Sequence, residues 1–191
     1  NCDRIANSTS SAVTSCIKVN AWNNSIIGNH ITFINNYNHI GIDLSGCTDT
    51  NCTGNTIVNR QESPTGTTSI GIKATGGGPD MCITGNLIDG MATAVDASGA
   101  NSHGYAITGN SVLYANTGMP VGGTVGSMSI TGNGFESTEV GIAVMDTATV
   151  HQSYGLAIVG NTFKDTYNDT IVAYGLRNSV IANNNFSNSG F

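Results

Sequence analysis

The sequence has few charged residues. Only 9% of its 191 residues are Asp, Glu, Lys or Arg, whereas soluble domains average about 25%. Six residues are basic and twelve are acidic, which gives a net charge of −6. A nucleic-acid-binding surface needs clustered Lys and Arg to neutralise phosphates, so this balance argues against a nucleic-acid partner.

Long hydrophobic runs are missing as well. No apolar run approaches the roughly 18 residues of a membrane-spanning helix, so membrane insertion is not expected. The chain opens at Asn1 without a signal-peptide pattern, and we interpret it as a mature or excised segment. Its 39% of apolar residues are enough for one core. We therefore predict a single domain over residues 1–191, with an irregular start over residues 1–12 and regular rungs from residue 13.

In place of charge, the sequence has a short phrase that recurs seven times. An apolar residue, any residue, Gly, Asn, any residue and then Ile, Val or Phe follow one another, with Asn183 replacing Gly in the last copy. Self-similarity at a period of about 23 residues is typical of a repeat fold. The Asn positions of the seven copies are Asn29, Asn55, Asn86, Asn110, Asn133, Asn161 and Asn184.

A second phrase lies between these Asn residues and keeps in phase with them. Gly41-Ile42-Asp43-Leu44 and Gly141-Ile142-Ala143-Val144 are two of its copies. Both phrases alternate apolar and polar residues with the two-residue period of a strand, and neither is long enough for a helix. Such a unit cannot bury its own apolar face and must stack on its neighbours. The sequence therefore predicts an all-β parallel solenoid of about seven rungs.

The repeated Asn residues are expected to form a ladder at one corner of the solenoid. An inward Asn in register from rung to rung can bond to the backbone or to the amides above and below it. The Gly before each Asn is expected to fit a tight corner in which a side chain would collide.

The Ile-x-Gly-Asn-x-Phe corner and the Gly-Ile-x-Val strand resemble the pectate-lyase-like right-handed parallel β-helix superfamily, which includes pectin-degrading enzymes and bacteriophage tailspikes. The resemblance covers about residues 13–191 and implies a single-stranded, right-handed parallel β-helix. The superfamily contains lyases, hydrolases, epimerases, binding modules and inert stalks, so it does not select one activity. It also implies a glycan partner, an extracellular or virion-surface location and a homotrimer.

One candidate surface is the outer face of the sheet that carries the Gly-Ile-x-Val phrase. Its outward column begins with Lys18, Asp43, Lys73 and Asp96, whose charges alternate. Opposite charges on adjacent rungs stabilise each other by roughly 0.2 to 1 kcal/mol, which favours a solvated salt-bridge ladder. The alternative is that Asp43 and Asp96 contact a glycan. They would lie about 10 Å apart, which is wide even for an inverting carboxylate pair.

The second candidate surface holds the most closely spaced acids of the chain, Glu136, Glu139 and Asp146, followed by an insertion with His151 and Tyr154. Sugar cleavage needs one carboxyl as acid and another as base or nucleophile, and sugar binding needs carboxylates beside an aromatic face. If the chain is a polysaccharide hydrolase or lyase, we predict that the three acids are catalytic. His151 and Tyr154 would then bind substrate. The alternative is an ordinary solvated loop.

The five cysteines do not show the paired spacing of a metal site, so neither a metal nor a cofactor is expected. Cys52 takes an inward apolar position. Cys47 lies five residues earlier, and Cys2 and Cys16 share the first rung. These spacings allow a local disulfide but do not decide for or against one.

Two functions from different classes remain after these exclusions. The first is a surface-glycan-engaging β-helix, such as a phage receptor-binding tailspike or a polysaccharide-depolymerase module. The second is a structural spacer without a site, in a virion fibre or an extracellular filament.

Overall fold

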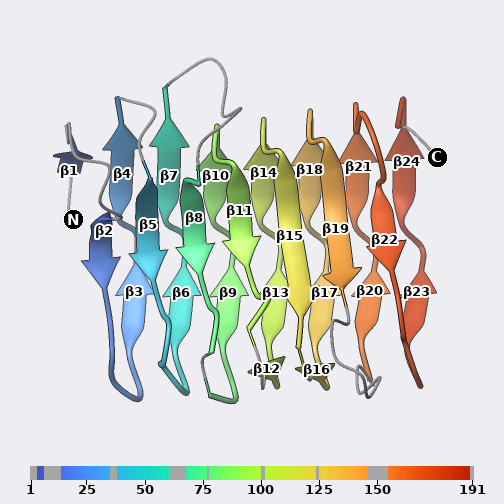
Figure 1. The fold of residues 1–191 in the computed structure, drawn as a ribbon, viewed down its shortest axis with the longest axis horizontal. Helices are drawn as coiled ribbons and strands as arrows, with labels where there is room; N and C mark the ends of the chain where they lie inside the picture. The colour runs from blue at the N-terminus through green and yellow to red at the C-terminus, as the bar shows by residue number, and fades with distance from the viewer. Residues whose placement is uncertain are drawn as a thin grey trace.

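The described residues of the chain build a stack of short parallel strands without a helix (Figure 1). The computed structural model describes residues 4–6, 14–34, 38–60, 68–76, 78–99, 102–123, 125–145 and 155–189. Within these ranges the strands fall into three long parallel sheets and one two-stranded sheet.

The three long sheets are named here by their place in Figure 1. The front sheet contains β2 (Thr14–Lys18), β5 (His39–Asp43), β8 (Ile70–Lys73), β11 (Thr93–Asp96), β15 (Thr117–Gly122), β19 (Val140–Met145) and β22 (Ile171–Ala173). The lower sheet contains β3 (Ser25–Ile27), β6 (Asn51–Thr53), β9 (Cys82–Thr84), β13 (Ala106–Thr108), β17 (Ser129–Thr131), β20 (Ala157–Val159) and β23 (Val180–Ala182).

The upper sheet has one strand more than the other two. It contains β1 (Arg4–Ala6), β4 (His30–Phe33), β7 (Thr56–Asn59), β10 (Leu87–Asp89), β14 (Ser111–Leu113), β18 (Gly134–Glu136), β21 (Thr162–Lys164) and β24 (Asn185–Ser187). Strand β1 lies within the start that we expected to be irregular, and it pairs with β4. A small sheet between the front and lower sheets contains β12 (Ser102–His103) and β16 (Val125–Gly126).

Each rung follows the order front, lower and upper strand, and each strand pairs in parallel with its equivalent on the next rung. In Figure 1 the chain runs down in the front sheet and returns upward behind it while it advances from left to right. That winding is right-handed. The predicted all-β, right-handed parallel β-helix is therefore confirmed.

The core is made of stacked inward columns. In the lower sheet the inward residues are Ile or Cys on successive rungs, and from Cys52 and Ile83 to Ile158 they are fully buried. In the upper sheet the column ends in three stacked rings, with centroids 4.8 Å apart between Phe135 and Phe163 and 5.4 Å apart between Phe163 and Phe186. Columns of like residues fill the interior because every rung presents the same position to its neighbours.

The Asn ladder forms as predicted, and each amide in its middle is fully bonded. The main-chain N–H and the Nδ2 of Asn110 both donate to Oδ1 of Asn133, at 2.9 Å each. The same Nδ2 also donates to the main-chain oxygen of Ile83 at 2.9 Å, while Oδ1 of Asn110 accepts two bonds from Asn86. This pattern uses two donors and two acceptors of one side chain, which is the full capacity of an amide.

The glycines before the ladder residues have a different reason from the one expected. A Cβ added to Gly54, Gly85 or Gly109 would meet nothing within 4 Å, so no collision excludes a side chain there. These residues have φ near +63°, a left-handed conformation that Gly adopts without strain. Asn183 takes the same conformation with φ 54°, because Asn tolerates it better than other side chains.

Close approach governs a different set of glycines, those of the front sheet. A Cβ on Gly71 would lie 2.6 Å from the main-chain oxygen of Ala94 and 2.6 Å from Cγ2 of Ile88. Gly41 and Gly141 have similar short distances to the next rung and to the core. It is therefore at the Gly of the second phrase that a side chain would collide with the next rung and with the core.

Candidate functional site

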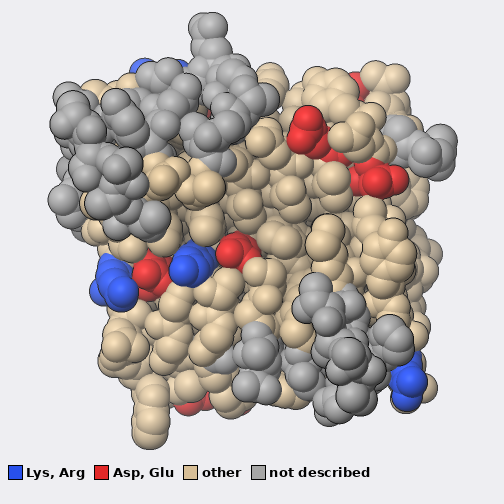
Figure 2. Space-filling model, viewed as in Figure 1, with Lys and Arg blue, Asp and Glu red and all other residues tan. Residues whose placement is uncertain are grey.

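The alternating column of the front sheet lies in one row on the surface. Register places Lys18, Asp43, Lys73 and Asp96 side by side on β2, β5, β8 and β11. Figure 2 shows this row as alternating basic and acidic side chains. The Nζ atom of Lys18 lies 3.7 Å from Oδ2 of Asp43.

Asp43 departs from the expected solvated ladder because it is only 5% exposed. Its Oδ1 accepts the main-chain N–H of Ser45 at 3.0 Å, and its Oδ2 accepts the Ser15 hydroxyl at 3.4 Å. Burial raises the pKa of this carboxyl, but the hydrogen bonds from Ser45 act against burial. The positive charges of Lys18 and Lys73 also lower the pKa. Together with the hydrogen bonds they outweigh burial, so the pKa of Asp43 lies below its ordinary value.

Asp96 ends its strand in the same kind of turn. Its Oδ1 accepts both the main-chain N–H of Ser98 at 3.0 Å and the Ser98 hydroxyl at 2.5 Å. The two aspartates of this column thus hold the chain at the end of their strands. A glycan contact by Asp43 or Asp96 stays a prediction.

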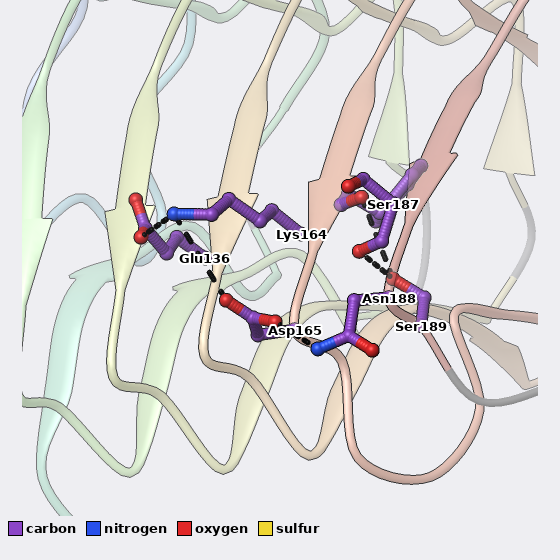
Figure 3. Close-up of polar contacts among 7 residues, drawn as sticks. Glu136, Lys164, Asp165, Ser187, Asn188 and Ser189 are labelled. Carbon is purple, nitrogen blue, oxygen red and sulfur yellow. Dashed lines mark hydrogen bonds and ion pairs between the residues drawn. The ribbon is translucent and has the colours of Figure 1, made fainter.

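The second predicted surface has a different character. Glu136 points outward from β18 on the upper sheet, and Lys164 holds the same position on the next rung, β21. The Lys164 Nζ atom donates to Oε1 of Glu136 at 2.5 Å and lies 3.9 Å from Oδ2 of Asp165 (Figure 3). Asp165 in turn accepts a hydrogen bond of 2.6 Å from Nδ2 of Asn188. These side chains form a polar chain along three successive rungs.

A shallow depression of about 140 Å³ lies beside this polar chain. Its floor is open because Gly134 stands between Ser111 and Thr162 in the outward column, and a Cβ there would meet nothing within 4 Å. We call it the Glu136 depression, and its lining residues are Ser111, Leu113, Gly134, Phe135, Glu136, Thr162 and Lys164.

Tyr114 is an aromatic residue close to the ion pair of Glu136 and Lys164. The hydrogen bond and the charge of Glu136 are the main causes that raise the pKa of Lys164, and Tyr114 adds a smaller contribution in the same direction. Tyr114 follows β14 in a left-handed conformation, with φ 50°, and is 59% exposed. An aromatic face is thus available at the corner next to the depression.

Glu139, the other described acid of this predicted surface, does not line the depression. Glu139 lies beyond the corner that Ser137 makes with φ 55°, immediately before β19 of the front sheet, and is exposed. Asp146, His151 and Tyr154 lie outside the described residues. The catalytic and substrate-binding roles assigned to these four residues stay predictions.

Three residues of the site were missed from sequence. Gly134 has the same place in its repeat as Ser111 and Thr162, and a comparison of this column would have shown the missing side chain. Tyr114 and Asp165 share the position directly after the column of Glu136, where each makes a left-handed corner. The repeat carries this signal, because equivalent positions of neighbouring copies can be aligned on either side of Glu136.

The described thiols are parts of the core or of a sheet, and no disulfide joins Cys47 to Cys52. The Cys47 thiol donates to the main-chain oxygen of Val19 at 3.1 Å. Burial raises the pKa of the Cys52 thiol to about 12. Within the described ranges, no group of three or more His, Cys, Asp or Glu could hold a metal ion, and no helix is long and apolar enough to cross a membrane.

The fold and the depression together define a right-handed parallel β-helix with a polar recess on one outer sheet. The family described as "Periplasmic copper-binding protein (NosD)" matches residues 65–191, and the chain belongs to this family. Neither a curated protein nor a solved structure matches the chain. The closer resemblance to pectin-degrading enzymes and tailspikes stays a prediction.

Proposed function

We propose that this chain is a glycan-binding β-helix of the periplasm or the outer cell surface, and that it contacts sugar at the Glu136 depression. The observation that carries the proposal is the depression itself, where an ion pair and two hydroxyl side chains lie close together. Tyr114 is on the adjacent strand end, where its main-chain N–H donates to the main-chain oxygen of Glu136 at 3.0 Å. The periplasmic character of the family supports this compartment.

The side chains of the depression match the chemistry of a sugar ring. Ser111 and Thr162 each offer a hydroxyl that donates and accepts, and the Glu136 carboxylate keeps acceptor positions beyond its bond to Lys164. Tyr114 supplies a flat apolar surface with a polar tip, which suits the face of a pyranose. In small-ligand sites a few placed polar groups fix the orientation of the ligand, and the polar groups of this depression are proposed to do so for one part of a sugar chain.

The same arrangement favours binding over cleavage. In a retaining or inverting glycosidase, two carboxyl groups face each other across the bond that is cut. Here the Lys164 ammonium lies between the Glu136 and Asp165 carboxylates, at 2.5 and 3.9 Å. Lys164 pairs with both carboxylates and neutralises part of their charge, which suits binding of a sugar better than its cleavage.

Copper, which the family description names, does not fit the described residues. Copper is bound by thiolate, thioether and imidazole ligands. The described ranges contain no group of three or more His, Cys, Asp or Glu that could hold a metal, and four methionines, Met81, Met91, Met119 and Met128, are buried in the hydrophobic core. Cys52 is a poor candidate ligand, because its raised pKa keeps the thiol protonated and Asn55 already contacts its sulfur. We derive no copper chemistry from this part of the chain.

A structural spacer is the second candidate, and the lower sheet supports it. None of the described side chains on its outward columns is charged, and most are small, which leaves little chemistry on that face. These residues are Ser25, Ile27, Asn51, Thr53, Cys82, Thr84, Ala106, Thr108, Ser129, Thr131, Ala157, Val159, Val180 and Ala182. The homotrimer expected from sequence stays a prediction that sedimentation of the parent protein tests.

Binding to a panel of surface polysaccharides and their oligosaccharides separates the two candidates. We expect the parent to bind at least one of them, and Glu136→Gln to weaken that binding about tenfold, because a charged hydrogen bond is lost. Asp96→Asn is the matched control, since it removes the same charge on the front sheet. New reducing ends or unsaturated products are not expected in these mixtures.

Two results would overturn the proposal. If no glycan of the panel binds the parent, the chain is better explained as a spacer. If Glu136→Gln binds as tightly as the parent while Asp96→Asn does not, the glycan lies on the front sheet instead.

A further inference from the structure

Asn133 and Gly134 form the only Asn-Gly dipeptide of the sequence, and they lie in the middle of the Asn ladder. Asn-Gly is prone to deamidation, because the glycine has no side chain to hinder ring closure. The main-chain nitrogen of Gly134 attacks the side-chain carbonyl carbon of Asn133 and loses its proton to solvent. Nδ2 takes up a proton from solvent, its bond to the carbonyl carbon breaks and ammonia leaves, after which water opens the succinimide ring to aspartate or isoaspartate.

In the folded chain neither reacting group is available, because both are engaged in hydrogen bonds. The N–H of Gly134 donates to the main-chain oxygen of Asn110 at 2.9 Å, so the attacking nitrogen is engaged in the upper sheet. The Asn133 side chain is 1% exposed and makes four hydrogen bonds within the ladder. Ring closure requires the rungs to separate first, and hydrolysis of the ring then requires water to reach a residue that is only 1% exposed in the folded chain.

We propose that Asn133-Gly134 is a latent deamidation site, which reacts when the rungs open and then prevents the ladder from forming again. The Nδ2 of Asn133 donates to Oδ1 of Asn161 at 3.0 Å and to the main-chain oxygen of Ile107 at 2.9 Å. An aspartate has no hydrogen to donate to either oxygen, and its charge would be buried. Isoaspartate also lengthens the main chain by one carbon at the corner.

The equivalent ladder residues on the neighbouring rungs are not followed by Gly. Asn110 is followed by Ser111 and Asn161 by Thr162, and these side chains hinder the attack. All three ladder residues have nearly the same bonds and the same burial. A difference in their reaction therefore comes from Gly134 alone, and chemical change of the unfolded chain at this residue is a cause of irreversible unfolding.

The test compares native and urea-unfolded protein at mildly alkaline pH over several days. Peptide mass spectrometry follows the change from amide to acid at Asn133, Asn110 and Asn161, and dilution of each sample gives the yield of refolding. We expect Asn133 to react at least about tenfold faster in urea than in the native protein, with the loss of refolding following the same time course. Asn110 and Asn161 should react far more slowly.

Gly134→Ala is the matched variant. Gly134 does not have a positive φ and a Cβ there meets nothing within 4 Å, so alanine fits the strand. We expect this variant to fold, and its refolding yield to outlast that of the parent after the same time in urea. The inference is wrong if Asn133 deamidates as fast in the native protein as in urea. It is also wrong if the parent loses refolding while Asn133 is still an amide.

Discussion

The residues in the middle of the Asn ladder are each held by neighbours on two rungs, so one substitution there removes several bonds. Asn110→Ala takes the acceptor away from the N–H and Nδ2 of Asn86, and it takes a donor away from Ile83 and Asn133. Because a buried polar group without a partner costs about 1 to 3 kcal/mol, we expect the free energy of unfolding to fall by at least about 2 kcal/mol. Chemical denaturation measures this change.

Asn116→Ala is the control for that prediction. Asn116 lies outside the ladder. Its main-chain oxygen accepts a hydrogen bond from the N–H of Val140, and alanine keeps this bond. We expect a loss below about 0.5 kcal/mol. Equal losses for the two variants would show that the amide network does not stabilise the ladder in solution.

Two aspartates have pKa values shifted in opposite directions, and this predicts opposite effects on stability. The pKa of Asp43 is lowered in the folded state, so its ionised form stabilises the protein above the unfolded pKa, and this contribution is lost as the pH falls through the folded pKa. Burial raises the pKa of Asp89, because Val58 and Leu113 flank it on the adjacent rungs. Its ionised form therefore destabilises the protein at neutral pH.

The measurement is the unfolding free energy of Asp43→Asn and Asp89→Asn between pH 7 and pH 3. At pH 7 we expect Asp43→Asn to be less stable and Asp89→Asn more stable than the parent, each by less than about 1 kcal/mol. Both differences should shrink as the pH falls to about 3 and the carboxyls take up protons. A difference of the same sign for both variants would contradict the assigned causes.

At the scale of the strand and its corner, the two sets of glycines predict different costs for a side chain. In Gly71→Ala the new methyl group meets a main-chain oxygen and the Ile88 side chain at 2.6 Å, and such overpacking costs typically about 1 to 3 kcal/mol. Gly85→Asn places in a corner the residue that the last rung already has at Asn183. We expect a cost below about 1 kcal/mol there, because Asn visits the left-handed region.

Thermal unfolding of these variants shows whether lack of space or backbone conformation makes glycine necessary at each position. Gly85→Ala adds a useful third variant, because it places a side chain without the tolerance of Asn for positive φ. The expected order of stability is Gly85→Asn, then Gly85→Ala, then Gly71→Ala. If Gly71→Ala melted like the parent, the close contact between front strands would not persist in solution.

At the scale of the whole molecule, the repeat made the fold predictable and left the site largely unpredicted. Seven copies of one phrase fix which residues face inward and which meet at the corner, because an error in one copy is corrected by the others. Glu136 and Lys164 could be paired for the same reason. The burial of Asp43 could not be read in this way, since it depends on the hydrogen bonds of Ser15 and Ser45 that do not recur on every rung.

The open recess at Gly134 depends on the absence of a side chain. A pattern of alternating polar and apolar residues does not reveal such an absence. The lining of the Glu136 depression comes from strands whose residues are 20 to 30 positions apart in sequence, and only the pairing of β14, β18 and β21 brings them together. A repeat thus predicts the columns of a solenoid well, whereas a site depends on the few rungs where a column is broken.

Stacked rungs also predict how stability is distributed along the chain. Because each rung contacts only its neighbours, local stability follows the number of packed neighbours and the burial of the inward column. The inward residues of β13 and β17 are fully buried, whereas Ile181 of β23 is 48% exposed and β24 is exposed throughout. In hydrogen exchange of the 191-residue chain, we expect the amides of β13 and β17 to exchange at least about tenfold more slowly than those of β23 and β24. Uniform protection from β13 to β24 would mean that the solenoid opens as one cooperative unit, and the nearest-neighbour description would then be wrong.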